Sequence, residues 1–158
     1  MAADGLPLRR IASVGPPLLC PSAQPDTAAA VVLGVIDHEA SPPEVQYLDQ
    51  PVPVTPELLA LAEPVRPTEV FRFAASCQQG ACSHWSGHDC SLVTRIVKLV
   101  PAASLALPPC RIRTDCRWFH QLAGEACRRC PSVVTQNQEP SDAMREAATP
   151  VEPAPEPG

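Results

Sequence analysis

The sequence has few aromatic residues, few glycines and no long hydrophobic run. Its 158 residues include three Phe, two Trp, one Tyr and seven Gly. The longest apolar run, residues 28–36, is far shorter than the ~18 residues that a membrane-spanning helix needs, so we expect no membrane segment. Nucleophile-elbow, H-E-x-x-H and Gly-rich phosphate-loop motifs are also missing. These absences argue against an enzyme, although a thiol nucleophile stays formally possible.

Proline, in contrast, is abundant, with 21 residues placed without any period. This excludes a collagen-like repeat and predicts long stretches without regular structure. Residues 1–17 show no hydrophobic periodicity, and residues 136–158 are too polar and too rich in Pro to bury a core. We therefore expect one domain over residues 18–135, between a disordered N-terminus and a disordered Pro/Glu/Ala-rich tail.

The N-terminal residues superficially suggest a secretory signal, because Arg9 and Arg10 precede an apolar stretch. Gly15-Pro16-Pro17 interrupts that stretch, and Leu19 stands where a lipoprotein cleavage site needs a small residue. We therefore expect a cytoplasmic protein. Cytosolic thiols are kept reduced, which favours metal binding by the cysteines over disulfides.

The hydrophobic pattern indicates a small α+β domain. Strand-like segments lie at 28–36, 44–48 and 69–73, and helix-like segments lie at 56–62, 91–100 and 112–122. The first two strands are expected to pair as an N-terminal β-hairpin. Thr55 and Pro56 are a typical helix start, with an N-cap hydroxyl followed by a proline at the first helical position. The short helices are expected to surround a cysteine-rich, metal-binding region.

Charge is unevenly distributed along the chain. Residues 1–70 carry a net charge of −6, residues 71–130 of +5 and residues 131–158 of −4. The positive segment also holds seven of the eight cysteines. A basic segment can bind nucleic acid, but its arginines can equally offset the negative charge of metal-bound thiolates. Because the rest of the chain is acidic, we favour charge compensation, and nucleic acid is not the expected partner.

The eight cysteines are twice the number that encloses one iron–sulfur cluster or one structural zinc ion. They are Cys20, Cys77, Cys82, Cys90, Cys110, Cys116, Cys127 and Cys130. The last four lie within 21 residues and include a C-x-x-C pair followed by Pro131, which is typical of a cluster's final ligands. Sequence spacing therefore predicts a cofactor site at Cys110, Cys116, Cys127 and Cys130.

Cys77, Cys82 and Cys90 form a triad that needs a fourth ligand. Cys20, His84, His88 and His120 are the candidates, and we take Cys20 as the fourth member of a second metal site. Each histidine has the alternative role of a solvated loop residue, and Cys20 that of a small buried apolar residue.

Iron–sulfur and zinc sites differ in the spacing that they require. Structural zinc modules usually contain two paired C-x2-4-C knuckles, whereas here one pair has two intervening residues and the other gaps are uneven. We favour an iron–sulfur cluster, in first place [4Fe–4S], with zinc as the alternative and a disulfide framework third.

A longer string of residues resembles a known family. The string runs from Phe71-Arg72-Phe73 through Cys77, Cys82-x-x-Trp85-x-Gly87-x-x-Cys90 and Pro109-Cys110-x-Ile112-Arg113 to Cys116-Arg117-Trp118-Phe119-x-Gln121-x-x-Gly124-x-x-Cys127-x-x-Cys130-Pro131. It resembles small cysteine-rich bacterial proteins, including cyanobacterial ones, that automatic labels sometimes call nitrogen-fixation proteins. The likeness covers about residues 18–135. It implies a cytoplasmic cysteine-rich domain and assigns no ligand or catalytic residue.

The functional prediction is a small iron–sulfur protein in electron transfer or redox sensing, or an accessory factor to a metalloenzyme. Its expected partner is a redox protein or metalloenzyme. The alternative is a zinc-stabilised adaptor that binds a protein or nucleic acid.

Overall fold

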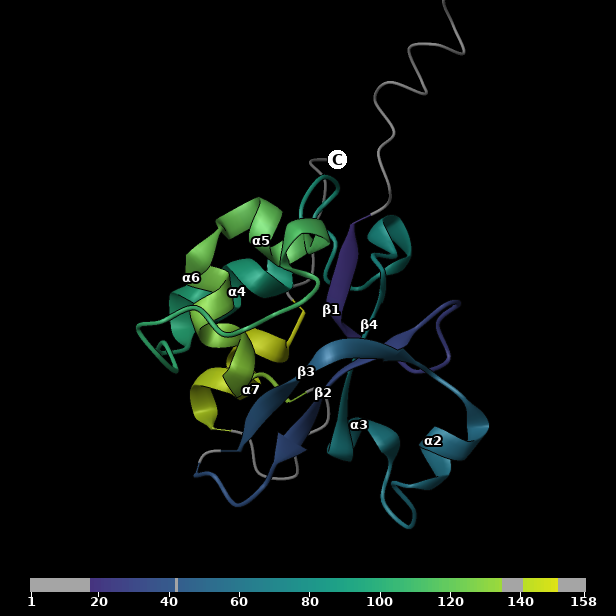
Figure 1. The fold of residues 1–158 in the computed structure, drawn as a ribbon. Coiled ribbons are helices and arrows are strands. Elements are labelled where there is room, and N and C mark those ends of the chain that lie inside the picture. The colour runs from purple at the N-terminus through teal and green to yellow at the C-terminus, as the bar shows by residue number, and fades with distance from the viewer. Residues whose placement is uncertain (1–17, 42, 135–140, 151–158) are drawn as a thin grey trace, which may run out of the picture.

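A four-stranded antiparallel sheet with short helices on both faces forms the protein (Figure 1). The computed structural model describes residues 18–41, 43–134 and 141–150. The architecture confirms the predicted α+β class. The disorder expected for residues 1–17 and for the two ends of the C-terminal tail falls outside the described residues. No helix of the described residues is long and apolar enough to cross a membrane.

The sheet has the strand order β1-β4-β2-β3. Its strands are β1 (Leu19–Ala23), β2 (Val31–Asp37), β3 (Glu44–Pro53) and β4 (Phe71–Ser76). β2 and β3 pair antiparallel as the predicted hairpin. At Gly34 a Cβ atom would lie 2.6 Å from the carbonyl oxygen of Gln46, so this close approach of the two strands needs glycine. β1 was not predicted, because its Leu-Cys-Pro-Ser-Ala sequence lacks the expected alternation.

Side chains of β4 alternate between two apolar layers. Phe73 packs with α2 (Pro56–Ala60) and α3 (Pro67–Val70) on one face of the sheet. Ala74 packs with the helices on the opposite face. Both side chains are completely buried, so β4 is covered on both faces of the sheet.

The second face of the sheet is covered by the cysteine-bearing helices. These are α4 (Ser91–Leu99), α5 (Arg117–Leu122), α6 (Gly124–Arg129) and α7 (Asp142–Ala148), with 3-10 turns at Gln79–Ala81, Arg113–Asp115 and Cys130–Ser132. α4 matches its prediction, with Val93 and Ile96 in the core. The helix predicted over 112–122 is interrupted, because Cys116 is extended between a 3-10 turn and α5.

The expectation of a disordered tail from residue 136 is wrong for α7. Ser141 caps this helix by accepting a hydrogen bond from the backbone N–H of Met144. Met144 and Ala147 are buried, and the helix packs against α4. Two apolar residues three positions apart can bury one face of a short helix, a signal that the polar composition concealed.

Candidate metal centres

The eight cysteines sort into two groups of four, and each group lines its own cavity. The first cysteine group is Cys20, Cys77, Cys82 and Cys90, around the first cavity. The second cysteine group is Cys110, Cys116, Cys127 and Cys130, around the second cavity. All eight are free thiols. The groups have the same membership as the two sites expected from the sequence.

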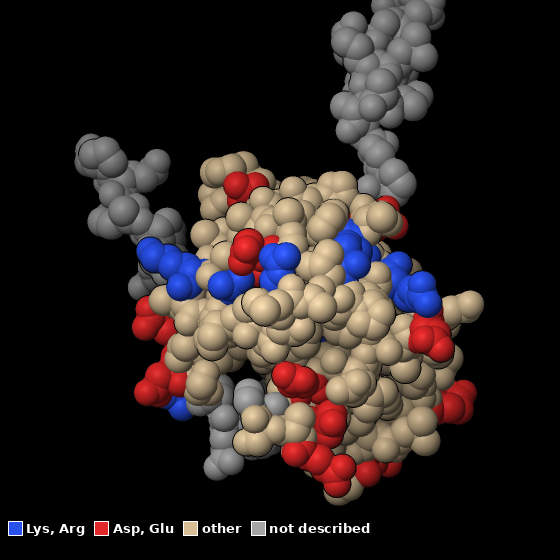
Figure 2. Space-filling view, turned by 60° about the vertical axis from the view of Figure 1, so that its left-hand side comes forward, with Lys and Arg blue, Asp and Glu red and all other residues tan. Residues whose placement is uncertain are grey.

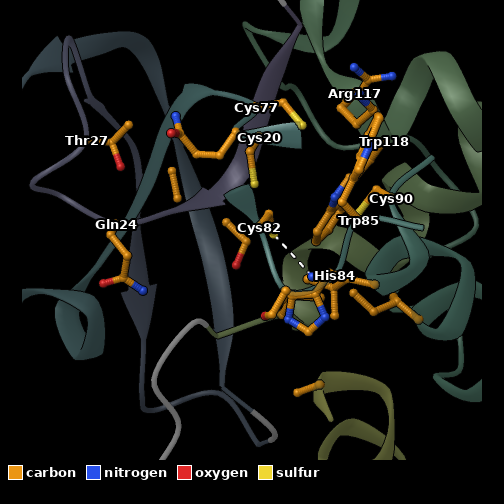
Figure 3. A pocket seen from close by; sticks show the side chains of 18 of the residues that line it. Cys20, Gln24, Thr27, Cys77, Cys82, His84, Trp85, Cys90, Arg117 and Trp118 are labelled. Carbon is orange, nitrogen blue, oxygen red and sulfur yellow. Dashed lines mark hydrogen bonds between the residues drawn. The ribbon is translucent and has the colours of Figure 1, made fainter. Parts of the chain in front are cut away.

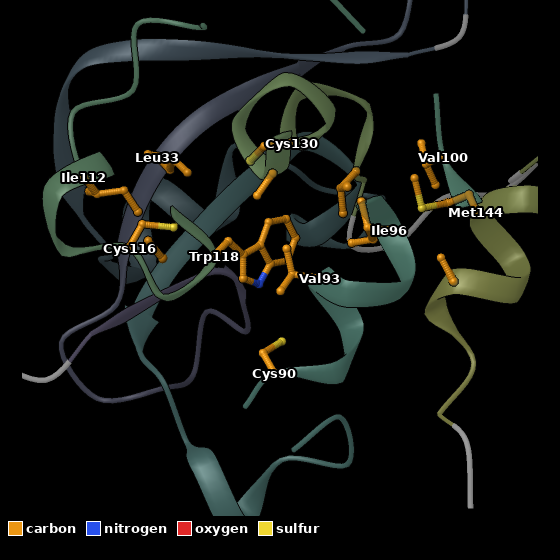
Figure 4. Close-up of a cluster of buried hydrophobic side chains, with 14 residues drawn as sticks. Leu33, Cys90, Val93, Ile96, Val100, Ile112, Cys116, Trp118, Cys130 and Met144 are labelled. Atoms are coloured by element: carbon orange, nitrogen blue, oxygen red, sulfur yellow. The ribbon is translucent and has the colours of Figure 1, made fainter. Parts of the chain in front are cut away.

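β1 runs between the two cavities. Cys20 lines the first cavity, and the next residue, the fully buried Pro21, lines the second. Successive side chains of a strand point to opposite sides, so β1 contributes to both walls. Trp118 of α5 also lines both cavities. Figure 4 shows its ring between Cys90 and the pair Cys116 and Cys130.

The first cavity is large, with a volume of about 630 Å³. In Figure 3, Cys20, Cys77 and Cys82 lie near the strand ends, and Cys90 lies beside the two tryptophans. The wall opposite the strands comes from α4, α5 and α7. This volume is typical of a ligand pocket and exceeds the room that a cluster of a few iron and sulfur atoms needs.

Hydrogen bonds hold the loop that carries the first group. The Gln121 side chain accepts a hydrogen bond from the Cys90 N–H at 2.9 Å and donates one to the Cys90 carbonyl at 2.8 Å. The backbone N–H of His84 lies 3.4 Å from the Cys82 sulfur and donates to it. Cys90 is thus fixed from α5, and Cys82 accepts the kind of N–H···S contact that stabilises a thiolate.

The second cavity is small, with a volume of about 10 Å³. About one water-sized atom fits such a space. Cys116 reaches this cavity from the break before α5, where a bridge to Leu19 ties it to β1. Cys127 comes from α6, and Cys130 follows at the end of that helix.

Four buried donor atoms on side chains that line these cavities make no hydrogen bond of ordinary geometry to the described residues, although the Tyr47 hydroxyl lies against the Cys130 thiol and interacts with it. They are the Tyr47 hydroxyl, Arg113 Nε, Arg117 Nε and Trp118 Nε1. Buried polar groups are normally paired, so each of these donors calls for an acceptor that the polypeptide does not supply, either an ordered water or a bound group. Donors without acceptors fit an anionic group with several acceptor atoms, which describes a metal–thiolate site or a cluster with its sulfides.

Arg72 of β4 lies on the same face of the sheet as Ala74, the face that α4 to α7 cover. It is fully buried between the two groups. Its guanidinium donates to the Cys130 carbonyl at 2.8 Å, the Val133 carbonyl at 2.7 Å and the Cys130 sulfur at 3.1 Å. It also donates to the Pro21 carbonyl. Trp118 lies beneath it, with the guanidinium carbon 5.5 Å from the ring centroid.

Burial favours the protonated form of four of the thiols, two in each group. It raises the pKa of Cys20 and of Cys116 to about 12. It also raises the pKa of Cys90 and of Cys110. Electrostatic interaction with Cys90 and Cys77, two members of its own group, also raises the pKa of Cys20. Metal binding at either cavity therefore has to displace protons from the thiols.

The side chains around the two cavities are chemically suited to bind a metal, but their positions are not yet those of a metal site. Among the described residues, no three Cys, His, Asp or Glu side chains are already close enough together to hold a metal ion. The free thiols must move together to bind one, and the second cavity must widen to take a cluster. The donor set itself fits, because four thiols with unpaired N–H and O–H donors around them form the first and second shells of a thiolate site.

The histidine candidates are not equivalent. His84 lines the first cavity, and its Nδ1 lies 2.8 Å from Arg95 Nη2. Burial and the neighbouring Arg95 charge lower its pKa, so the neutral ring is favoured. His88 is exposed beside Asp89, and His120 contacts the Thr114 carbonyl. Neither His88 nor His120 lines either of the two cysteine cavities.

Basic side chains form a band across one face of the molecule, with acidic ones in its lower part and others beside and above the band (Figure 2). Several arginines of residues 71–130 are bonded within the protein. Arg129 donates to the Val100 carbonyl at 2.6 Å and pairs with Glu125 at 2.8 Å. Arg128 donates to the Leu105 carbonyl at 3.0 Å. These contacts use arginines to fix the cysteine-bearing segments.

Sequence reasoning missed Arg72 and Tyr47 as members of the site. Arg72 lies in an alternating strand pattern that otherwise buries apolar side chains, and a charged residue in such a position is a usable signal. Tyr47 gave no comparable signal, because tyrosine is common in strands.

Comparisons of this chain with known protein families, with curated proteins and with solved structures found no match.

Proposed function

We propose that the protein binds two metal–thiolate centres, one in each cavity, and that at least the first is an iron–sulfur cluster used in electron transfer or redox sensing. The observation that carries this proposal is the position of the four unpaired buried donors, all on side chains that line the two cysteine cavities. A buried donor without an acceptor costs free energy, so a bound group that supplies acceptors beside the thiols would stabilise the fold.

The large first cavity supports the assignment of a cluster there. Its volume of about 630 Å³ leaves space beyond the four thiols. A cluster supplies one-electron chemistry when bound. The chain contributes the four thiol ligands, the apolar wall of Trp85 and Trp118, and the His84 N–H that donates to the Cys82 sulfur. A redox protein or metalloenzyme fits as the partner.

A structural zinc ion is the second candidate for the second cavity. The specific observation that favours zinc is the volume of about 10 Å³, which suits one ion better than a cluster. Zinc binds four thiolates as a tetrahedron with Zn–S distances of about 2.3 Å and contributes directly to folding.

The test is anaerobic purification of the full chain, followed by metal and sulfide analysis and an absorption spectrum. We expect broad visible absorbance with iron and acid-labile sulfide, and zinc in addition if the second cavity holds it. A colourless protein with zinc alone would support the adaptor function, and a protein that binds neither metal would refute both.

A further inference from the structure

Arg72 carries a charge that no carboxylate neutralises. It is completely buried, and no described Asp or Glu lies within ion-pair distance of its guanidinium. The arginine side chain stays protonated in proteins. A buried charge without a counter-charge is strongly unfavourable, so the position calls for an anion nearby.

The neighbours that can become anionic are cysteines of both groups. Cys130 of the second group accepts a hydrogen bond from Arg72 at its sulfur and another at its carbonyl. On the other side, Arg72 donates to the carbonyl of Pro21, the residue after Cys20 of the first group. Both cysteines interact electrostatically with Arg72. The guanidinium therefore lies between the two groups and is bonded to the segments that carry them.

Metal loading would supply the missing charge. A divalent metal ion, or a cluster core of charge 2+, leaves two net negative charges when four thiolates bind it. One positive charge between two such centres lowers the free energy of each. When a low-potential one-electron reductant passes its electron to a cluster, no bond forms or breaks, and the added negative charge is stabilised by the same guanidinium.

We propose that Arg72 is a shared counter-charge on which both cysteine groups depend for metal retention, and which favours the reduced state of an iron centre beside it. This inference rests on the proposed function, because it requires anionic metal–thiolate centres. Arg72 is a positioning and electrostatic residue and not a metal ligand, because its N–H groups donate to atoms of the protein.

The test compares Arg72→Gln, which removes the charge, with Arg72→Lys, which keeps the charge but loses the guanidinium fork. Arg66→Gln is the matched control, because Arg66 is exposed at the start of α3 and lines neither cavity. Each full-length protein is purified anaerobically, its folding is checked by circular dichroism, and metal loss from both groups into EDTA is timed. Where iron is present, its reduction is titrated with dithionite.

We expect Arg72→Gln to lose metal from both groups at least tenfold faster than the wild type, whereas Arg72→Lys stays within about threefold and Arg66→Gln is unchanged. The reduction equilibrium of iron in Arg72→Gln should shift about tenfold toward the oxidised state, equal to about 59 mV for one electron. If Arg72→Gln does not fold, Arg72→Lys alone provides the test. Retention of metal by Arg72→Lys would show that the positive charge is what matters, and loss of metal from both of its cysteine groups would show that it is not.

Three results would overturn the proposal. They are a metal-loaded Arg72→Gln that behaves as the wild type, loss of metal from one group alone, and equal loss in the Gln and Lys variants. A wild-type protein that binds no metal would instead show, before any variant is compared, that the proposed function itself fails.

Discussion

Cys20 and Cys77 line the same cavity although 57 residues separate them, because β1 pairs antiparallel with β4. The backbone N–H of Cys77 donates to the carbonyl of Leu18 at 2.8 Å, and Cys20 lies opposite Ala75. Strand pairing thus places both residues at one end of the sheet. Cys20 is as much a member of the first group as the three cysteines close to one another in sequence.

Serine substitutions should therefore reveal two independent groups. We expect Cys20→Ser to remove the metal of the first cavity and Cys127→Ser to remove that of the second. The double variant Cys20→Ser/Cys77→Ser should lose no more than Cys20→Ser alone, because one lost ligand already empties that site. Cys20→Ser/Cys127→Ser should lose nearly all metal. Metal analysis of the four proteins checks this, and full metal content in Cys20→Ser would contradict the grouping.

Sequence spacing predicted the second group and the triad of Cys77, Cys82 and Cys90, whereas Cys20 was taken as the fourth member from four candidates. The α+β class, the β2–β3 hairpin and α4 followed from local patterns, since apolar periodicity and capping residues act over a few positions. The position of Cys20 depends on pairing between distant strands, which no local pattern encodes. The unequal cavities and the place of Arg72 between them are likewise products of tertiary packing.

Gln121, which is not itself a ligand candidate, should stabilise the position of Cys90 and so help the first group to retain its metal. Its side chain makes two hydrogen bonds to the backbone of Cys90 and a third to Thr94 Oγ1 at 3.2 Å. Gln121→Leu removes all three bonds and leaves the Cys90 N–H unpaired, so we expect about 1–3 kcal/mol of lost stability. Denaturant unfolding measures this loss, and metal analysis should show weaker retention at the first cavity only.

Thr94→Val is the comparison for that experiment, because it removes the Thr94 hydroxyl bonds to Gln121 and to the Cys90 carbonyl but leaves both Gln121–Cys90 bonds in place. We expect a loss of less than about 1 kcal/mol and normal metal retention. Equal effects of the two substitutions would mean that the Gln121 clamp on Cys90 has no particular role.

Fluorescence of the two tryptophans should distinguish the two cavities. Of these two cavities Trp85 lines the first alone, whereas Trp118 lines both. An iron–sulfur cluster that absorbs near the tryptophan emission should quench a nearby ring. In Trp118→Phe, the remaining Trp85 emission should be quenched by iron loading, and Cys20→Ser should reduce that quenching more than Cys127→Ser does. In Trp85→Phe, Trp118 should still be quenched when either cysteine is replaced, provided that both centres contain iron. Fluorescence before and after anaerobic reconstitution measures both effects, and equal quenching of Trp85 in the two cysteine variants would be inconsistent with the cavity assignment.

α7 should stabilise the domain and close one side of the first cavity. Met144 is buried against the helical core, and Arg95 Nε donates to the carbonyl of Ala147 at 2.8 Å, which ties α7 to α4. Met144 also lines the first cavity. Because truncation of a buried Met to Ala leaves a void, we expect Met144→Ala to lower the free energy of unfolding by about 2 kcal/mol, at the low end for such changes, since a short helix can partly collapse into the space.

Glu146→Ala is the matched control for α7, since Glu146 is exposed on the same helix. It should change the unfolding free energy by less than about 0.5 kcal/mol, as surface substitutions usually do. Urea unfolding of the metal-free proteins separates packing from metal binding, and EDTA challenge of the loaded proteins should then show faster metal loss from the first cavity in Met144→Ala. If Met144→Ala were as stable as Glu146→Ala, α7 would not pack on α4 in solution, and the domain would end before it, as the composition of residues 136–158 had indicated.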